Sequence, residues 1–369
     1  LISTSTSTSG FGQDPEFTQF YSNPIYLNPA LAGTHGCPRL NLNYRNEWAN
    51  ISGAFVTNSV SYDQFVNVLQ GGIAIMVTND MAGKNTLNWS TINLAYSYHL
   101  QVSRKFTMLF GAQATWNQKF LDWSKLTFGD QIDPRRGFIY QTGDLPRGNF
   151  WNDGGSWGSK GFFDVSAGIV GYSENFYFGF AAKHLNTPEE SLILNPDGES
   201  QLPMRFTGHM GANIEFGKGS QYQNVTSVSP NVIYTYQDGF MQLNVGTYIQ
   251  YGAFTAGAWW RPRDAFILSI GVDAGAFRFG YSYDITISPL TNASGAEGSA
   301  TISAAVASIK SSPTILTPFS SLMEPRPRED TPNFTPSSSS CLAILPIGVS
   351  SSLALPMKLL PSLWRDVIR

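Results

Sequence analysis

The chain has 369 residues and a formal net charge of −3, and 14% of its residues are aromatic while only 13% are charged. Soluble domains carry about 25% charged residues, so this composition argues against an ordinary soluble protein, and the lack of a basic excess argues against nucleic-acid binding. The chain has no clean run of roughly 20 apolar residues, which argues against a helical membrane protein and leaves a closed β-barrel as the other structure that satisfies backbone polar groups in lipid.

The first part of the chain is not expected to contribute to a sheet. Residues 1–12 are rich in Ser and Thr, and we interpret them as a residual export signal or a vector-derived segment. Residues 13–37 contain two Asn-Pro steps, at Asn23-Pro24 and Asn28-Pro29. Because proline removes a donor from the hydrogen-bond ladder, we predict an irregular N-terminal arm on the periplasmic side. Such an arm could plug the barrel or dock a partner.

Residues 91–100 show the pattern that defines most of the remaining chain. Apolar or aromatic residues alternate there with small or polar ones: Ile92, Leu94, Tyr96, Tyr98 and Leu100. This alternation predicts a strand with one apolar and one polar face. Thirteen strand-like segments occur, at roughly 38–50, 53–62, 70–79, 88–101, 104–118, 161–172, 175–185, 203–216, 224–237, 239–250, 253–262, 265–273 and 276–288. Barrels of this type have an even strand number, so we predict an all-β transmembrane antiparallel β-barrel of 14 strands within residues 38–303, closed by a strand beginning at Gly298.

The lengths of the predicted connections alternate along the chain. If the first strand rises from the periplasm, the short turns face the periplasm, and the long connections at about 119–160, 186–202 and 288–298 lie outside. Short periplasmic turns and long outer loops are the expected asymmetry. We therefore predict an outer-membrane protein with a periplasmic N-terminus and extracellular long loops. The outer loop at 148–157, rich in Gly, Trp and Asn, could bind a partner or could simply cap the lumen.

The same alternation places charged side chains in the lumen. The candidate lumen charges are Arg39, Arg45, Glu47, Asp164, Lys183, Arg205, His209, Glu215, Arg278 and Asp284. An Arg or Lys that faces mid-bilayer lipid costs about 2–4 kcal/mol, which favours these inward positions. A ring of charge can select ions, but the mixed signs favour salt-bridged packing that blocks the lumen. The tryptophans near strand ends are expected to anchor the barrel at the membrane interface: Trp48, Trp89, Trp116, Trp259 and Trp260.

No motif predicts a catalytic or cofactor site. The four histidines lack metal-ligand spacing, and no nucleophile elbow distinguishes one serine for a hydrolase. We therefore predict neither enzymatic activity nor a bound metal or cofactor. The two cysteines, Cys37 and Cys341, lie in unlike segments and do not suggest a disulfide framework.

Residues 304–369 depart from the barrel pattern. They are rich in Ser and Pro, a composition that stays disordered in most proteins. Two interpretations remain open, a mobile periplasmic tail or a wrongly assigned end of the sequence.

The arm carries a resemblance to a known family. Residues 13–33 read QDPEFTQFYSNPIYLNPALAG, which closely resembles the mature N-terminus of the PorP/SprF family of type IX secretion system outer-membrane proteins. A second match runs from Asp164 through Phe176-Tyr177-Phe178-Gly179 to His184-Leu185, and a weaker third match lies at residues 298–303. The third match departs from the family pattern, because Ala300-Thr301 stands where the family has His-Glu.

The resemblance implies a role in exporting or anchoring a large cargo, such as a gliding adhesin with a type IX C-terminal signal. The implied partners are outer-membrane lipid, type IX translocon subunits, the adhesin itself and a peptidoglycan-linked periplasmic protein. The candidate partner-binding or plug residues of the arm are Gln13, Asp14, Pro15, Phe17, Tyr21, Asn23, Pro24, Tyr26, Asn28 and Pro29. The alternatives are a passive solute or ion channel of the outer membrane, a barrel enzyme and a soluble β-sandwich.

Overall fold

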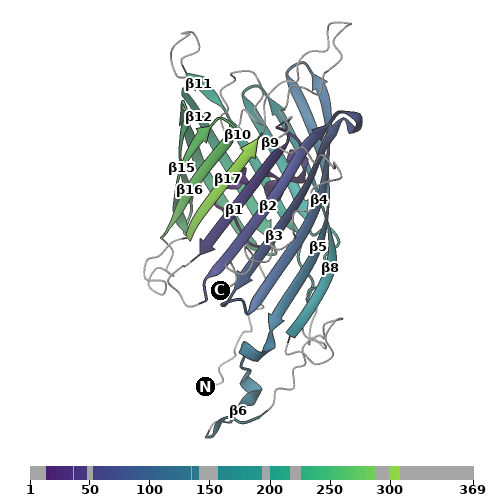
Figure 1. Ribbon diagram of the computed structural model, residues 1–369, viewed down its shortest axis with the longest axis vertical. Helices are drawn as coiled ribbons and strands as arrows, with labels where there is room; N and C mark the ends of the chain where they lie inside the picture. The colour runs from purple at the N-terminus through teal and green to yellow at the C-terminus, as the bar shows by residue number, and fades with distance from the viewer. Residues whose placement is uncertain are drawn as a thin grey trace, which may run out of the picture.

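The computed structural model describes residues 14–35, 37–47, 53–133, 135–140, 157–192, 200–216, 226–287 and 299–307. These residues form a closed antiparallel β-barrel of 14 strands (Figure 1), as predicted. The strands are β1 (Arg39–Glu47), β2 (Phe55–Val66), β3 (Gly71–Ala82), β4 (Leu87–Ser103), β5 (Phe106–Asp122), β8 (Trp157–Ser173), β9 (Phe176–Lys183), β10 (Arg205–Ala212) continued by β11 (Ile214–Phe216), β12 (Thr226–Gln237), β13 (Phe240–Tyr251), β14 (Phe254–Arg261), β15 (Ala265–Ala274), β16 (Phe277–Thr286) and β17 (Ser299–Ala307). None of the helices in the described ranges has the length and apolar character needed to cross a membrane.

Strands β1 and β17 close the barrel. They pair from Arg39 opposite Ala307 to Glu47 opposite Ser299. The last strand therefore continues four residues past Ser303, whereas the composition predicts that the tail begins at residue 304. The reason is that small residues keep the strand alternation, with Ser303 buried and Ile302 exposed. The remainder of the predicted tail lies outside the described residues.

The strands turn apolar side chains outward and mostly polar side chains inward, and the inward apolar side chains, such as Leu109 and Ile233, pack in the core. On β4, Leu94 is 57% exposed, whereas its neighbour Asn93 is 4% exposed. On β16, Phe279 is 54% exposed and Asp284 is 3% exposed. An apolar outer surface with a polar interior is the arrangement of a barrel that sits in lipid.

The two ends of the barrel differ. One end, the short-turn end, carries the tight turns at residues 104–105, 174–175, 252–253 and 275–276. The other end, the long-loop end, carries the connections at residues 123–156, 184–204 and 287–298, together with the tight turn at Asp238-Gly239. Within the first of these connections, β6 (Ile132–Asp133) and β7 (Gly137–Phe138) form a small separate hairpin.

The N-terminal arm occupies the interior of the barrel. It consists of the helical turns η1 (Phe20–Ser22), α1 (Pro24–Leu27) and η2 (Pro29–Leu31). The side chain of Ile25 is 0% exposed and that of Leu31 is 1% exposed. The apolar core of the molecule therefore lies between this arm and the barrel wall.

Glycines in the wall make room for the arm. A Cβ atom at Gly168 would lie 2.0 Å from Asn28 Oδ1, one at Gly111 would lie 2.2 Å from the backbone nitrogen of Ala30, and one at Gly72 would lie 2.0 Å from the carbonyl oxygen of Ala32. These distances are far below contact distance, so any other residue would push the arm away.

Cys37, which links the arm to β1, is fully buried.

Candidate functional site: the arm inside the barrel

The arm runs the length of the lumen. Its first described residue, Asp14, contacts His184 and Arg205 at the long-loop end. At the short-turn end, the backbone N–H of Gly33 donates to Asp63 Oδ2 at 3.0 Å. We predict an arm that could plug the barrel or dock a partner, and the structure places residues 14–33 inside the barrel, starting at the end that carries the long loops. Contacts with the wall explain this location.

Asp14 is held by a buried histidine. His184 directly follows β9 and has φ +57°, which turns its ring into the lumen. Its Nε2 lies 2.9 Å from Asp14 Oδ2, and its Nδ1 lies 2.9 Å from Asp164 Oδ2. Burial opposes the charged imidazolium, but the two aspartates outweigh burial and raise the pKa of His184 to about 9. Burial also opposes the charged Asp14 carboxylate, yet His184 and Arg205 outweigh it and hold the pKa of Asp14 well below its usual range.

Two arginines of the wall bind the acidic start of the arm. Arg205 Nη1 lies 3.3 Å from Asp14 Oδ2, and Arg205 Nη2 lies 3.4 Å from Glu16 Oε1. Arg261 Nη2 lies 3.8 Å from Glu16 Oε2. These arginines come from β10 and β14, which β12 and β13 separate in the closed sheet, so the start of the arm bridges two non-adjacent strands.

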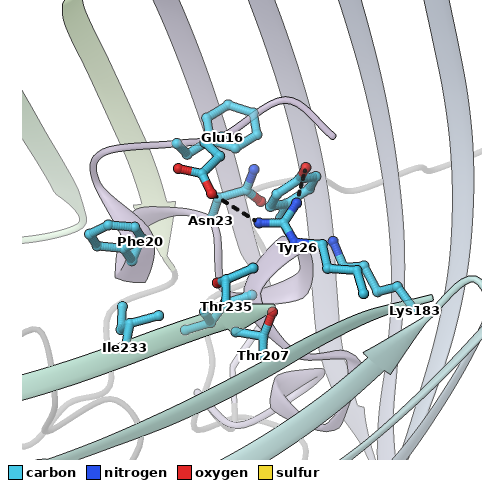
Figure 2. Close-up of a pocket in the computed structure, with 11 residues that line it drawn as sticks. Glu16, Phe20, Asn23, Tyr26, Lys183, Thr207, Ile233 and Thr235 are labelled. Carbon is cyan, nitrogen blue, oxygen red and sulfur yellow. Dashed lines mark hydrogen bonds and ion pairs between the residues drawn. The ribbon is translucent and has the colours of Figure 1, made fainter. Parts of the chain in front are cut away.

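Tyr26 completes this group of residues. The ammonium of Lys183 lies 3.6 Å from the centre of the Tyr26 ring. This is a cation–π contact, and such contacts are stronger when the cation is shielded from water. Figure 2 shows Tyr26, Glu16 and Asn23 of the arm facing Lys183 and the strands that carry Thr207 and Thr235. A cavity with about 30 Å³ of free volume remains here, which is room for one or two water molecules.

A second ionic group joins β1 and β16 over the arm. Arg45 forms ion pairs with Glu47 and with Asp284, the latter at 3.7 Å. The same guanidinium donates to the carbonyl oxygen of Glu16. Arg45 thus ties β1 to β16 and to the arm.

The two Asn-Pro steps explain how the arm fits the middle of the lumen. Each proline starts a helical turn, and each preceding asparagine reaches the wall. Asn28 Nδ2 donates to the carbonyl oxygens of Ile169 at 3.1 Å and Phe180 at 3.2 Å, and it lies 3.1 Å from His209 Nε2. Asn23 Nδ2 donates to Ser59 Oγ at 3.1 Å. The asparagines are therefore polar anchors, and the prolines preset the turns that follow them.

Polar and aromatic contacts continue along the arm. Thr18 Oγ1 lies 2.8 Å from Thr301 Oγ1, and Gln19 Nε2 donates to Ser282 Oγ at 3.3 Å. The hydroxyl groups of Tyr21 and Tyr177 share a hydrogen bond. The rings of Phe20 and Trp259 lie with centroids 5.0 Å apart.

Two of the tryptophans predicted at the membrane interface lie in the lumen instead. Trp259 is 2% exposed and packs on the arm, and Trp89 is 9% exposed beneath Lys119. The prediction is wrong for these two because their strand positions have inward parity. Trp116 and Trp260 face outward at 50% and 47% exposure, and Trp48 lies outside the described residues.

The structure brings most of the candidate lumen charges to the interior. Those that are buried are Arg39, Arg45, Asp164, Lys183, Arg205, His209 and Asp284. Glu47 and Arg278 are partly exposed, and Glu215 is exposed on β11, beyond the break at Asn213. Arg39 pairs with Asp63 at 2.9 Å, and Arg278 pairs with Asp273. Charged side chains of opposite sign are thus paired with each other inside the barrel.

Of the candidate arm residues, Asp14, Phe17, Asn23, Pro24, Asn28 and Pro29 are buried, while Pro15, Tyr21 and Tyr26 are partly buried; Gln13 lies outside the described residues. Glu16, Asp63 and Arg261 are not among the predicted site residues, and His184 has no predicted role. Strand parity would have placed Asp63 and Arg261 in the lumen. Within the described ranges, no group of His, Cys, Asp and Glu residues could hold a metal ion.

A larger cavity lies beside the arm at the short-turn end. It has about 120 Å³ of free volume, and its lining includes Tyr21, Arg39, Tyr248 and Arg278. The arm therefore fills the lumen unevenly, with the tighter packing at the long-loop end.

Comparison with known proteins gives one family and several distant barrels. The model of the family described as type IX secretion system membrane protein PorP/SprF matches residues 9–305. The toluene transporter TbuX of Ralstonia pickettii is 10% identical with a TM-score of 0.43, over 77% of this chain and 92% of that chain. The outer membrane protein Omp33 of Acinetobacter baumannii is 9% identical with a TM-score of 0.39, over 74% of this chain and 99% of that chain. A FadL homologue of Pseudomonas aeruginosa is 10% identical with a TM-score of 0.39, over 77% of this chain and 94% of that chain. A search of curated proteins finds no match.

Proposed function

Because this chain belongs to the PorP/SprF family of type IX secretion system membrane proteins, we propose that it serves as an arm-filled outer-membrane scaffold that supports export or surface anchoring of a large cargo. The cargo class we propose is a surface protein with a type IX C-terminal signal, such as a gliding adhesin. The observation that carries the proposal is the filled lumen. A barrel whose interior holds its own N-terminal segment offers its loops and turns to partners more readily than it offers a path to solutes.

We further propose that the long-loop end faces the cell exterior. Short periplasmic turns and long outer loops are usual for barrels of this kind. In this orientation, the ionic anchor at Asp14 lies at the outer mouth, and the larger cavity beside Tyr21 opens toward the periplasm. Cargo would then meet the loops at 123–156 and 184–204, and a peptidoglycan-linked partner would meet the short-turn end.

We propose that the protein is not an enzyme. Its buried charged groups are engaged with one another or with the arm, for example Arg205 with Asp14 and Arg39 with Asp63. This arrangement supports structural roles for these groups.

Passive conduction is the second candidate function. The cavity beside Tyr21 and Arg278 favours it, because conduction through that side of the lumen would need only part of the arm to move. A pore of this kind would use the mixed charges of the wall to select solutes.

The test of the scaffold is genetic and biochemical. Deleting the gene should lower the amount of type IX cargo on the cell surface, as measured by surface biotinylation and mass spectrometry, and the wild-type gene should restore it. A tagged protein extracted in mild detergent should bring a translocon subunit or a surface adhesin with it at near-stoichiometric levels. Unchanged surface cargo together with extraction free of either companion would contradict the scaffold and favour the channel.

A further inference from the structure

The small hairpin of β6 and β7 stands away from the barrel. It lies in the connection between β5 and β8, where Ile132 pairs with Phe138 and Asp133 pairs with Gly137. Figure 1 shows β6 at the extreme long-loop end, well beyond the barrel strands. A two-stranded hairpin is at best marginally stable alone in water, so this one invites a packing partner.

The hairpin exposes large apolar side chains. Phe138 is 61% exposed, Tyr140 is 56% exposed, and Ile132 and Ile139 are each 48% exposed. Four such residues lie within nine positions of the chain, Ile132 directly opposite Phe138, and we call these four side chains the apolar patch; exposed apolar residues gathered on soluble parts of proteins mark interaction sites.

Lipid does not account for this exposure. On β5 the outward side chains are apolar up to Trp116, which is 50% exposed; they are followed by Gln118, which donates to Ser159 on β8, and by the half-buried Phe120. The outward apolar side chains of β5 therefore end with the strand, at about Phe120. The hairpin lies beyond Asp122, the last residue of β5, on the side away from these side chains.

Two arginines lie beside the apolar patch. Arg135 and Arg136 are exposed at the turn of the hairpin. The carboxylate of Asp133 is occupied with the turn itself, since its Oδ1 accepts the backbone N–H groups of Arg135 at 2.8 Å and Arg136 at 2.9 Å, and its Oδ2 accepts the Tyr140 hydroxyl at 3.2 Å. The two guanidinium groups are thus presented outward, and among the described residues neither one forms an ion pair.

We propose that the β6–β7 hairpin is a docking surface for another protein, one that presents an apolar groove bordered by carboxylates. Aromatic side chains and arginines are the residues most enriched at protein interfaces, and the pair of cations selects an acidic rim through charge complementarity. This inference rests on the proposed function in one respect, which is that the partner is met on the long-loop side of the membrane.

The test uses the full-length protein in its native membrane. A photoreactive phenylalanine analogue replaces Phe138 in one strain and Asp238, in a tight turn at the same end, in another. We expect irradiation to join the Phe138 position to one other protein and the Asp238 position to none. In the Phe138 strain, the double change R135E and R136E should lower the adduct yield at least tenfold. The matched control K84E, a charge reversal in another turn at this end, should leave the yield unchanged.

Several results would overturn the docking surface. They are adducts with phospholipid only, adducts with a second copy of this chain, no adduct at all, or an adduct that persists in the R135E and R136E variant. Heat-modifiable migration on gels shows that each variant is folded, and the pair I139S and Y140S, which keeps both arginines, should also lower the yield. If the adduct is insensitive to these changes while gene deletion still lowers surface cargo, the docking surface is wrong and the scaffold function stands.

Discussion

His184 Nε2 and Asp14 Oδ2 lie 2.9 Å apart, although 170 positions separate the two residues in the chain. Asp164 holds the other ring nitrogen of the same histidine. One imidazole thus links the start of the arm to the wall of the barrel at β8 and β9. This link, with Arg205 beside it, holds the beginning of the arm at the long-loop end.

Replacing Asp14 by Asn should loosen the start of the arm. The change leaves Arg205 and the imidazolium of His184 buried with one fewer anion, and breaking a buried ion pair costs about 3–5 kcal/mol. The reporter is a cysteine introduced at Thr18, and its rate of reaction with a maleimide is measured. The rate should be higher in the Asp14→Asn variant than in the protein that carries only Thr18→Cys. Asp238→Asn, at an exposed turn, is the matched control and should not change the labelling rate. Equal labelling rates for the parent protein, Asp14→Asn and Asp238→Asn would show that Asp14 does not anchor the arm.

Arm anchoring should depend on pH in a direction set by the two partners. The folded-state pKa of His184 is raised to about 9 from 6.5, so its contribution is fully present below pH 6.5 and is lost as the pH rises through about 9. Asp14 has a lowered pKa, so its contribution is present above its ordinary value of 3.8 and is lost as the pH falls below that value. The labelling rate at position 18, divided by that of a cysteine introduced at the exposed turn residue Asp238, should rise between pH 7 and pH 10, and His184→Gln should largely remove that dependence. The reference position cancels the general increase in thiolate reactivity with pH. An identical pH profile in the variant would contradict this assignment.

The wall glycines beneath the arm should resist substitution. Gly168→Ala and Gly111→Ala place a methyl group about 2 Å from Asn28 and Ala30, and overpacking of this kind costs about 1–3 kcal/mol. Both variants should unfold at lower temperature than wild type in detergent. Gly208→Ala is the control, since its Cβ would meet no atom within 4 Å, and it should have a near wild-type melting temperature.

Replacing each of two adjacent tryptophans by alanine should lower the free energy of unfolding by very different amounts. Trp259→Ala removes a lumen ring that packs on Phe20 and Tyr248, so it should cost about 3–5 kcal/mol in urea unfolding. Trp260→Ala removes a ring that faces outward, and its cost should be smaller. The reverse order of the two costs would contradict the placement of Trp259 inside the barrel.

The barrel itself could be predicted from the sequence, but the path of the arm could not. Alternation with period two is a local property, so residues such as Leu94 and Asn93 reveal their faces without any knowledge of the fold. The arm has no such period. Its location depends on contacts such as Asn28 with His209 and Gly33 with Asp63, whose partners are specified only after the barrel closes. Strand parity, applied to every strand, would have placed Trp259 and Arg261 inside, whereas the break at Asn213 that exposes Glu215 left no sign in the pattern.

Planar-bilayer conductance of the purified full-length protein, compared with a variant that lacks residues 14–33, tests most directly whether the arm fills the lumen. We predict no steady conductance for the full-length protein and stable open channels for the variant, with the sheet content of both unchanged by circular dichroism. Steady channels of the same size in both proteins would contradict the filled barrel and would make passive conduction the leading function.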